Sequence, residues 1–211
     1  MGQKVNPISL RLGEFYTWNS LWYANKKDFK TVLLEDLKLR RYLMKKLAIA
    51  GITGVRIERS INKIRVTIQV TRPGMVIGRG GVGLEDIKKS LCQLVSIQDP
   101  EKNLEIRPEE VKTPDLSAIY VARWISESLQ KRMPFRQLAR KSIERTMAAG
   151  AKGIKIVLSG RVNGAEIART ERFVKGKVPL QTMRAKIDYS DYPSLTRSGY
   201  IGVKVWICTQ D

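Results

Sequence analysis

The feature that most constrains the fold is a glycine-rich turn, Val76-Ile77-Gly78-Arg79-Gly80-Gly81, which lies between an alternating strand pattern and a helical pattern. Glycine lacks a Cβ atom, so it tolerates positive φ and lets another backbone or a phosphate approach closely. The helix predicted to begin near Gly83-Leu84 adds the partial positive charge of its first turn. The strand, the turn and the helix therefore form a corner that suits a polyanion, and Arg79 at the tip of the turn adds a positive charge.

The turn by itself admits three interpretations. As G-x-x-G, from Gly78 to Gly81, it fits the loop with which a KH domain clamps about four nucleotides. As G-x-G-x-x-G, at Gly78, Gly80 and Gly83, it fits the dinucleotide-binding turn of a Rossmann fold. It also fits a plain strand-to-helix turn that binds nothing, because short motifs of this kind have a known false-positive risk. The elements on either side of the turn are needed to choose between them.

The order of the neighbouring elements favours the KH interpretation. Helical spacing predicts a first helix over 29–50 that ends at Gly51, with an inner stripe of Leu33, Leu37, Leu43 and Leu47. Alternation predicts two antiparallel strands over 55–59 and 63–70, and a short strand over 103–107 follows the second helix. Helix, strand, strand, glycine loop, helix, strand is the order of a type II KH domain.

A Rossmann fold makes different demands. Its first strand is a buried, nearly continuous apolar strand of a βαβ unit, whereas the strand before this turn is half polar. It also needs an acidic residue about twenty positions further on. Asp99 and Glu101 are the candidates, and both lie in a polar stretch before the next strand. These differences weigh against a dinucleotide site.

The second half of the chain is predicted to form another α+β domain. A proline-containing connector over 99–115 precedes two helices, one capped by Thr113 and one over 135–149. The candidate strands that follow are residues 153–159, 165–170, 180–189 and 200–207. We therefore expect an α+β fold of two domains, the second with two helices on a four-stranded, mainly antiparallel sheet. The expected boundaries are an irregular N-terminal arm over 1–27, the KH domain over 28–108 and the C-terminal domain over 109–211.

Charge points to a polyanionic partner. The 211 residues have a formal net charge of +19, and such an excess destabilises a compact state unless a partner neutralises it. Residues 131–177 contain 13 lysines or arginines against 3 acidic residues. Solvated charged helices normally alternate in sign, and this region does not. A basic region of this kind predicts contact with nucleic acid, mostly through phosphates.

The residues that are missing exclude several classes of protein. There is no histidine, which excludes histidine acid–base chemistry, Ser-His-Asp triads and most zinc sites. The two cysteines, Cys92 and Cys208, fit no metal spacing. No apolar run reaches the roughly 18–20 residues of a membrane-spanning helix, and no phosphate-binding loop of the G-x-x-x-x-G-K-[ST] type is present. We expect a soluble cytoplasmic protein with no catalytic residues, metal site or cofactor.

Several longer stretches resemble the family of bacterial small-subunit ribosomal protein three. The resemblance covers nearly the whole chain, and its stretches are longer and more specific than the glycine motif. They are Met1-Gly-Gln-Lys-Val-Asn-Pro7, Trp18-Asn-Ser20, Arg72-Pro-Gly-Met-Val-Ile-Gly78, Gly150-Ala-Lys-Gly-Ile154, Ser159-Gly-Arg161, Gly164-Ala-Glu-Ile-Ala-Arg-Thr170 and Gly199-Tyr-Ile-Gly-Val-Lys-Val-Trp206.

The resemblance implies a non-enzymatic ribosomal protein. It would bind 16S ribosomal RNA in the head of the small subunit and line the path by which messenger RNA enters. Neighbours in the head would include ribosomal proteins ten and fourteen, and no membrane would be involved. The family positions that contact and help to unwind the message correspond to Arg136, Gln137 and Arg140, where Gln137 replaces the usual basic residue. The family also often has two basic residues between the outer glycines, where this chain has Arg79-Gly80.

Two further groups of residues are expected to touch RNA. In the KH domain they are Gly78, Arg79, Gly80, Gly81, Lys88 and Lys89. Contacts to ribosomal RNA phosphates are expected from Lys131, Arg132, Lys141, Arg145, Arg161, Arg169, Arg172, Lys175 and Lys177. Two alternatives from other classes stay open from the sequence: a nicotinamide enzyme that uses Gly78, Gly80 and Gly83, and a free-standing KH regulator of messenger RNA.

Overall fold

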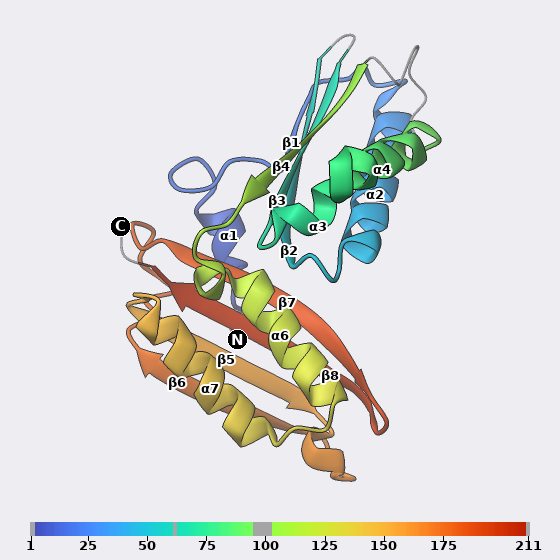
Figure 1. Ribbon diagram of the computed structural model, residues 1–211. Coiled ribbons are helices and arrows are strands. Elements are labelled where there is room, and N and C mark those ends of the chain that lie inside the picture. Colours follow the sequence, from blue (N-terminus) through green and yellow to red (C-terminus); the bar gives the residue numbers. More distant parts are fainter. Residues whose placement is uncertain (1–2, 61–62, 95–102, 210–211) are drawn as a thin grey trace. The chain divides into compact units, whose positions relative to one another are not determined.

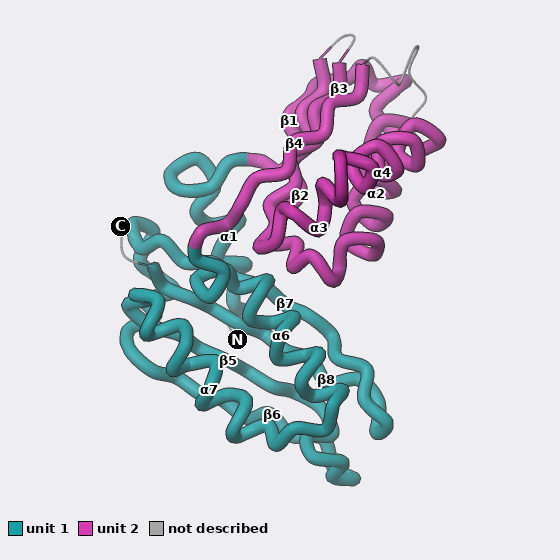
Figure 2. Tube along the Cα trace, viewed as in Figure 1, with its two compact units in different colours: residues 1–17, 113–211 teal, residues 18–112 magenta. Residues whose placement is uncertain are grey.

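The computed structural model describes residues 3–60, 63–94 and 103–209. It divides the chain into two compact units, one of residues 18–112 and one of residues 1–17 together with 113–211 (Figures 1 and 2). We call them the KH unit and the C-terminal unit. The acidic candidates Asp99 and Glu101, at the start of the predicted connector, lie outside the described residues.

The KH unit contains a four-stranded sheet with its helices on one face (Figure 1). Its elements are β1 (Ser20–Leu21), α2 (Phe29–Lys46), β2 (Ile52–Arg59), β3 (Ile64–Val70), α3 (Pro73–Ile77), a 3-10 turn (Arg79–Gly81), α4 (Val82–Cys92) and β4 (Leu104–Glu110). The strand order is β1-β2-β3-β4, with β2 and β3 antiparallel and the two outer pairings parallel. The sequence predicted the order of α2, β2, β3, the turn, α4 and β4, but neither β1 nor the short helix α3 before the turn.

The face of α2 that packs on the sheet differs from the predicted one. Leu39, Leu43 and Leu47 are buried in the core, whereas Leu33 and Leu37 are each 41% exposed. At about 100° per residue, the positions of Leu33 and Leu37 lie roughly a quarter turn away from the buried stripe. The prediction that Leu33 and Leu37 face inward was therefore wrong, and an apolar strip is left on the outside of α2.

The C-terminal unit is a second α+β structure with an entirely antiparallel sheet in the order β6-β5-β8-β7. Its elements are α1 (Pro7–Leu10), a 3-10 turn (Pro114–Leu116), α6 (Ala118–Gln130), α7 (Phe135–Ala148), β5 (Gly153–Gly160), a 3-10 turn (Val162–Gly164), β6 (Arg169–Gly176), β7 (Ile187–Thr196) and β8 (Gly199–Cys208). α6 and α7 lie side by side on one face of the sheet (Figure 1). Alternate residues of β5 and β8 point to this face, and Ile156, Val203 and Val205 are completely buried under the helices.

The other face of this sheet has its own small apolar cluster. Ile187 and Trp206 are buried there, and Leu180 and Ala185 from the irregular segment 177–186 pack against them. This segment explains why two predicted strands were misplaced. β6 continues to the glycine at position 176, and the irregular segment follows it before β7 begins. The predicted strand 165–170 is therefore replaced by Arg169–Gly176, and the predicted strand 180–189 by Ile187–Thr196.

The N-terminal stretch 1–27, expected as one irregular arm, is shared between the two units. Residues 3–17 belong with the C-terminal sheet, where the buried guanidinium of Arg11 donates hydrogen bonds to carbonyl oxygens of the segment 177–186. Residues 18–27 belong with the KH unit, where β1 pairs with β2. The arm also contains a helical turn, α1, capped by the Asn6 side chain, which accepts a hydrogen bond from the backbone N–H of Ile8 at 2.9 Å.

Candidate nucleic-acid interface

The glycine turn has the backbone geometry that only glycine adopts easily. Gly78, Gly80 and Gly81 have φ of 72°, 62° and 85°. A Cβ atom on Gly78 would lie 2.9 Å from the backbone nitrogen of Gly83, so the start of α4 packs directly against the turn. Bare backbone and the first turn of an 11-residue helix therefore meet at one exposed corner. This is the arrangement that can hold a phosphate.

The basic residues near this corner are solvent-accessible. Arg79 is exposed at the tip of the turn. Lys88 is half-buried and Lys89 exposed, and both lie in the second turn of α4, on the helix that begins at the glycines. The structure thus brings Arg79 and the glycines together, with the two lysines further along the same helix.

The side chains predicted on α7 form an exposed basic face because the helix buries its opposite side. Phe135, Leu138 and Ile143 pack into the core under the helix. Arg136, Gln137 and Arg140 point outward from its first two turns and are exposed. The apolar stripe that the sequence predicted for α7 is the buried side of the helix, and its burial turns these three residues outward.

A basic groove of about 450 Å³ runs between α7 and β6. Two of its cations, Arg136 and Arg140, come from the helix, and two, Arg172 and Lys175, come from the strand. Phe173 and Ile143 line it between them, and Glu144 is the acidic residue in its wall. Gln137 does not line the groove. The groove joins residues predicted separately as messenger contacts and as ribosomal RNA contacts, and four cations around an apolar strip suit a nucleic-acid backbone with its bases.

Three of the other predicted phosphate contacts have partners within the C-terminal unit. The Arg145 guanidinium lies 4.8 Å from the centre of the Trp124 ring, and Arg161 Nε donates a 2.9 Å hydrogen bond to the Ala165 carbonyl. Arg169 forms a 3.3 Å ion pair with Glu171. Lys131, Arg132, Lys141 and Lys177 are exposed outside the groove. Among the predicted phosphate contacts, Arg172 and Lys175 are the ones that line the groove with Arg136 and Arg140.

A second basic cluster lies on the other face of the same sheet, and the sequence analysis missed it. Lys155, Lys4, Arg172 and Lys204 line a cavity of about 380 Å³ whose apolar walls include Trp206. Lys155 Nζ lies 5.2 Å from the centre of the Trp206 ring. Burial lowers the pKa of the Lys155 ammonium, and the nearby Lys4 and Arg172 cations lower it further. The available signal was strand alternation, since Lys155 falls between the inward-facing Ile154 and Ile156.

Lys155→Met is expected to stabilise the free protein at pH 7. A lysine whose folded-state pKa is lowered binds its proton less readily when folded, so its charge opposes folding below that pKa and stability recovers as pH rises toward the unfolded value near 10.4. We expect a gain of a few tenths of a kcal/mol at low salt, as for other surface charge pairs. Urea unfolding at pH 7 and pH 10.5 measures it, and the gain should shrink at the higher pH. Lys177→Met controls for the added apolar surface, and a less stable Lys155→Met protein at pH 7 would contradict the prediction.

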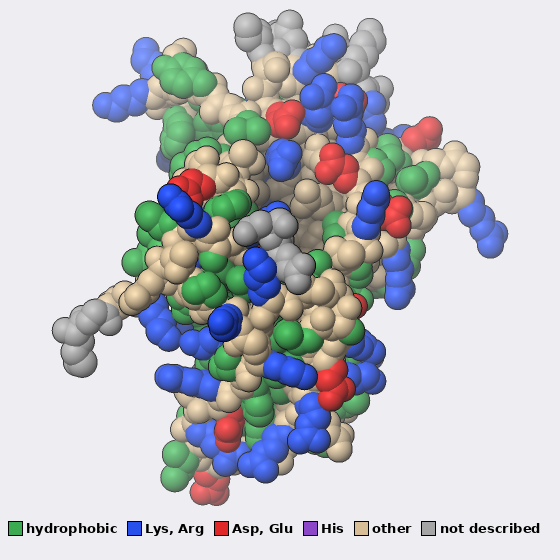
Figure 3. Space-filling model, turned by 90° about the vertical axis from the view of Figure 1, so that its left-hand side faces the viewer, with side chains coloured by type: hydrophobic (Ala, Val, Ile, Leu, Met, Phe, Trp, Pro, Cys, Tyr) green, Lys and Arg blue, Asp and Glu red, His purple; other side chains and the backbone are tan. Residues whose placement is uncertain are grey.

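Positive charge is not confined to residues 131–177 on the surface of the protein. On the face in Figure 3, lysine and arginine side chains are widespread and acidic side chains are sparse.

Within the described part of the chain, no helix has the length and apolar character to cross a membrane. The same residues include no cluster of three acidic or cysteine side chains placed to hold a metal ion.

Comparison with known proteins identifies the family of both units. A family model described as "Ribosomal protein S3, C-terminal domain" matches residues 125–207, and a KH domain model matches residues 38–116. The small ribosomal subunit protein uS3 of Desulforudis audaxviator is 49% identical over 207 residues, which are 98% of this chain and 93% of that protein. The uS3 proteins of Brevibacillus brevis and Protochlamydia amoebophila are 48% and 47% identical over 98% of this chain, and over 91% and 94% of their own lengths.

These matches decide between the interpretations of the glycine turn. The KH match spans the turn and the elements on both sides of it, which supports the clamp over a dinucleotide site. Together with the two α+β units of the structure, the two family matches confirm the predicted fold class and the family resemblance. The relatives are ribosomal proteins and not enzymes, so the prediction of a non-enzymatic protein is confirmed as well.

Proposed function

The chain belongs to the family of small ribosomal subunit protein uS3, and from this premise we propose that it binds 16S ribosomal RNA in the head of the small subunit and lines the path by which messenger RNA enters. The observation that carries the messenger part of the proposal is the basic groove between α7 and β6. Its position on an exposed helix face makes it available to a strand that passes over the protein surface.

The groove acts by charge and shape. Arg136 and Arg140 on one wall, with Arg172 and Lys175 on the other, neutralise phosphates of an RNA strand. Phe173 and Ile143 between the walls offer apolar surface to a base. Nothing in this arrangement cleaves a nucleotide, so unwinding is passive. The movement of the ribosome supplies the energy, and the groove holds one strand after it separates from its partner.

The KH corner contributes a second RNA contact. The backbone of Gly78 to Gly81 approaches the RNA backbone, and Arg79 adds a charge at the tip. The replacement of a second basic residue by Gly80 removes one phosphate contact compared with the usual family loop. The glycines therefore act mainly through close approach and backbone N–H groups.

The exposed apolar strip on the outside of α2 is an argument for contact with a neighbouring protein. Phe29, Leu33, Leu34 and Leu37 are 41–49% exposed on the same helix, an apolar surface that a water-exposed helix does not need. The family resemblance points to ribosomal proteins ten and fourteen as neighbours in the head. A place in the small ribosomal subunit also makes the cytoplasm the proposed compartment.

The double variant Arg136→Ala/Arg140→Ala tests the messenger part of the proposal. The double variant is expected to slow translation through a message with a stable hairpin and to leave translation of an unstructured message unchanged. Loss of two phosphate contacts should also make the slope of log K against log salt for single-stranded RNA shallower by about 1.4. The measurement is translation by small subunits assembled with each variant.

The control double variant is Arg184→Ala/Lys186→Ala, which removes the same charge from the segment 177–186, outside the groove. Sucrose gradients show whether each variant still sediments with small subunits, as we expect for both. Normal passage through the hairpin by assembled Arg136→Ala/Arg140→Ala subunits would remove the groove from the messenger path. Failure of the unmodified chain to sediment with small subunits would overturn the ribosomal role itself.

A further inference from the structure

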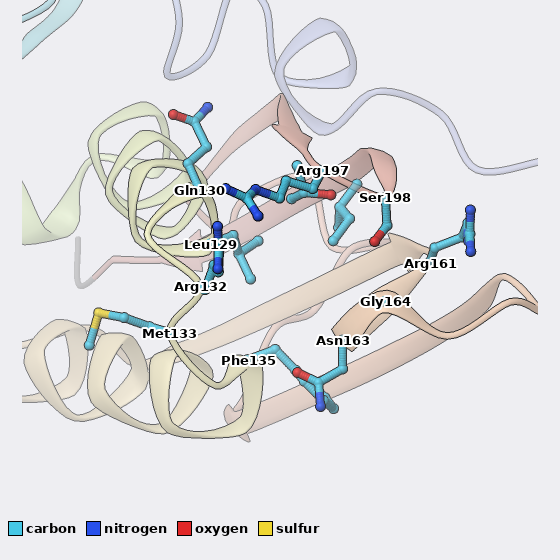
Figure 4. Close-up of a pocket in the computed structure, with 12 residues that line it drawn as sticks. Leu129, Gln130, Arg132, Met133, Phe135, Arg161, Asn163, Gly164, Arg197 and Ser198 are labelled. Atoms are coloured by element: carbon cyan, nitrogen blue, oxygen red, sulfur yellow. The ribbon is translucent and has the colours of Figure 1, made fainter.

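A cavity of about 560 Å³ in the C-terminal unit lies at the end of the sheet where three connections meet (Figure 4). The connections are those between α6 and α7, between β5 and β6, and between β7 and β8. Its volume is within the range of sites that enclose a small organic ligand. It is separate from the groove between α7 and β6, and no residue lines both.

The rim of the cavity carries two arginines whose charge is not matched inside the unit. Arg132 comes from the α6–α7 connection and Arg197 from the β7–β8 turn, and both are exposed. Neither forms an ion pair among residues 3–60, 63–94 and 103–209. Figure 4 shows Arg197 turned toward the end of α6, where Arg132 and Leu129 lie, whereas Arg161 points away from the cavity. Two guanidinium groups at one rim form a site for a phosphate, which arginine binds through paired hydrogen bonds.

The floor of the cavity is apolar and formed by buried side chains. Leu129, Phe135 and Ile201 line it, and they are 8%, 6% and 3% exposed. Polar side chains of Asn163 and Ser198 lie around this floor (Figure 4). An apolar floor with hydrogen-bonding groups at its edge suits a nucleobase, and a cationic rim suits the phosphate attached to it.

Phe135 connects this cavity to the groove. Its ring lines the cavity, and the Arg136 guanidinium of the groove lies 5.6 Å from the centre of the same ring. A strand held by Arg136 can therefore reach the cavity within a short length of backbone. An acidic peptide would meet the same two arginines, but the apolar floor favours an aromatic base over a carboxylate side chain.

We propose that this cavity holds one unstacked nucleotide of single-stranded RNA, with its base against Leu129, Phe135 and Ile201 and its phosphate between Arg132 and Arg197. The proposal rests on the proposed RNA-binding function and adds to it a site outside the groove. The cavity is then a binding site for one nucleotide. A strand that also lies in the groove must release this nucleotide before it can move on by one base, so it does not slide freely.

The test is titration of the full chain with UMP and AMP, followed by NMR shifts of the lining residues. We expect binding with a dissociation constant on the order of 1 mM, as befits a single nucleotide. Arg132→Ala and Arg197→Ala should each weaken it about tenfold, the usual effect of losing a hydrogen bond to a charged group. Ser198→Trp fills the cavity without a change in charge and should abolish binding. Arg184→Ala, an exposed arginine that lines neither site, is the matched control.

Two further arms separate this proposal from the proposed function. The groove variant Arg136→Ala/Arg140→Ala should lose affinity for long single-stranded RNA but keep UMP binding. Inorganic phosphate should bind more weakly than UMP, because it cannot use the apolar floor. Equal affinity for phosphate and UMP, or unchanged UMP binding in folded Ser198→Trp, would overturn the proposal. Absence of any UMP shift at the lining residues would overturn it too, and loss of UMP binding in the groove variant would assign the binding to the groove.

Discussion

Arg11→Met is expected to reduce the free energy of unfolding of the C-terminal unit by about 3 kcal/mol, because several backbone acceptors would lose their donor at once. The Arg11 side chain is 1% exposed. Its guanidinium donates to the carbonyl oxygens of Ala185 at 2.6 Å, Thr182 at 2.7 Å, Pro7 at 3.0 Å and Leu180 at 3.1 Å. Methionine keeps much of the apolar stem and removes all of these donors.

The loss should be local, and hydrogen exchange can measure it by segment. Peptides from residues 3–17 and 177–186 should exchange faster in Arg11→Met, while peptides from the KH unit should be unchanged. Urea unfolding gives the change in free energy. The control is Arg184→Met, an exposed arginine of the same segment, for which we expect a change within about 0.5 kcal/mol. Equal stability of the two variants would show that Arg11 does not anchor the segment.

Asp36→Ala is expected to destabilise the KH unit by about 3 kcal/mol, since removing one partner of a buried ion pair leaves the other charge uncompensated. Asp36 is 2% exposed and accepts hydrogen bonds from Arg59 Nε at 2.8 Å and from the Trp22 indole nitrogen at 2.7 Å. Glu35, 2.9 Å from Arg59, compensates part of the loss. The indole N–H and one side of the guanidinium would be left without an acceptor.

For Asp36→Ala, hydrogen exchange should become faster in the KH unit and not in the C-terminal unit. Residues 18–27 and α2 should lose protection in Asp36→Ala, and the C-terminal sheet should keep it. Asp86→Ala removes an exposed carboxylate from α4 of the same unit and should change the free energy of unfolding by less than about 0.5 kcal/mol. If both aspartate variants unfold at the same urea concentration as the unmodified chain, the buried network has no role in stability.

The buried side chains of Arg11 and Asp36 explain why the N-terminal stretch 1–27 is divided between the two units. Arg11 ties its first part to the C-terminal unit, and Asp36 ties its second part to the KH unit through Trp22. Composition could not show this, because lysine, arginine and aspartate are exposed in most proteins and are buried only where a partner is supplied. The partners of Arg11 in the segment 177–186 are more than 160 residues away along the chain.

The candidate site was predictable where it depends on local pattern. The α7 stripe placed Arg136 and Arg140 outward, and the glycine turn was found from its spacing and its neighbours. Prediction failed where it depends on pairing between distant segments. Nothing local says that Arg172 and Lys175 lie across a groove from α7, or that Lys155 shares a cavity with Lys4.

The sequence alone was enough to predict most of the element types, the two α+β units, the position of the glycine turn and the basic character of residues 131–177. These follow from periodicity, glycine conformation and net charge, which act over a few residues or over the whole composition. The folded structure was needed to show which face of α2 is buried, where the irregular segment 177–186 replaces a strand, and which cations share a groove or a cavity. Those outcomes depend on contacts between residues far apart in the chain, where burial and hydrogen bonding outweigh local preference.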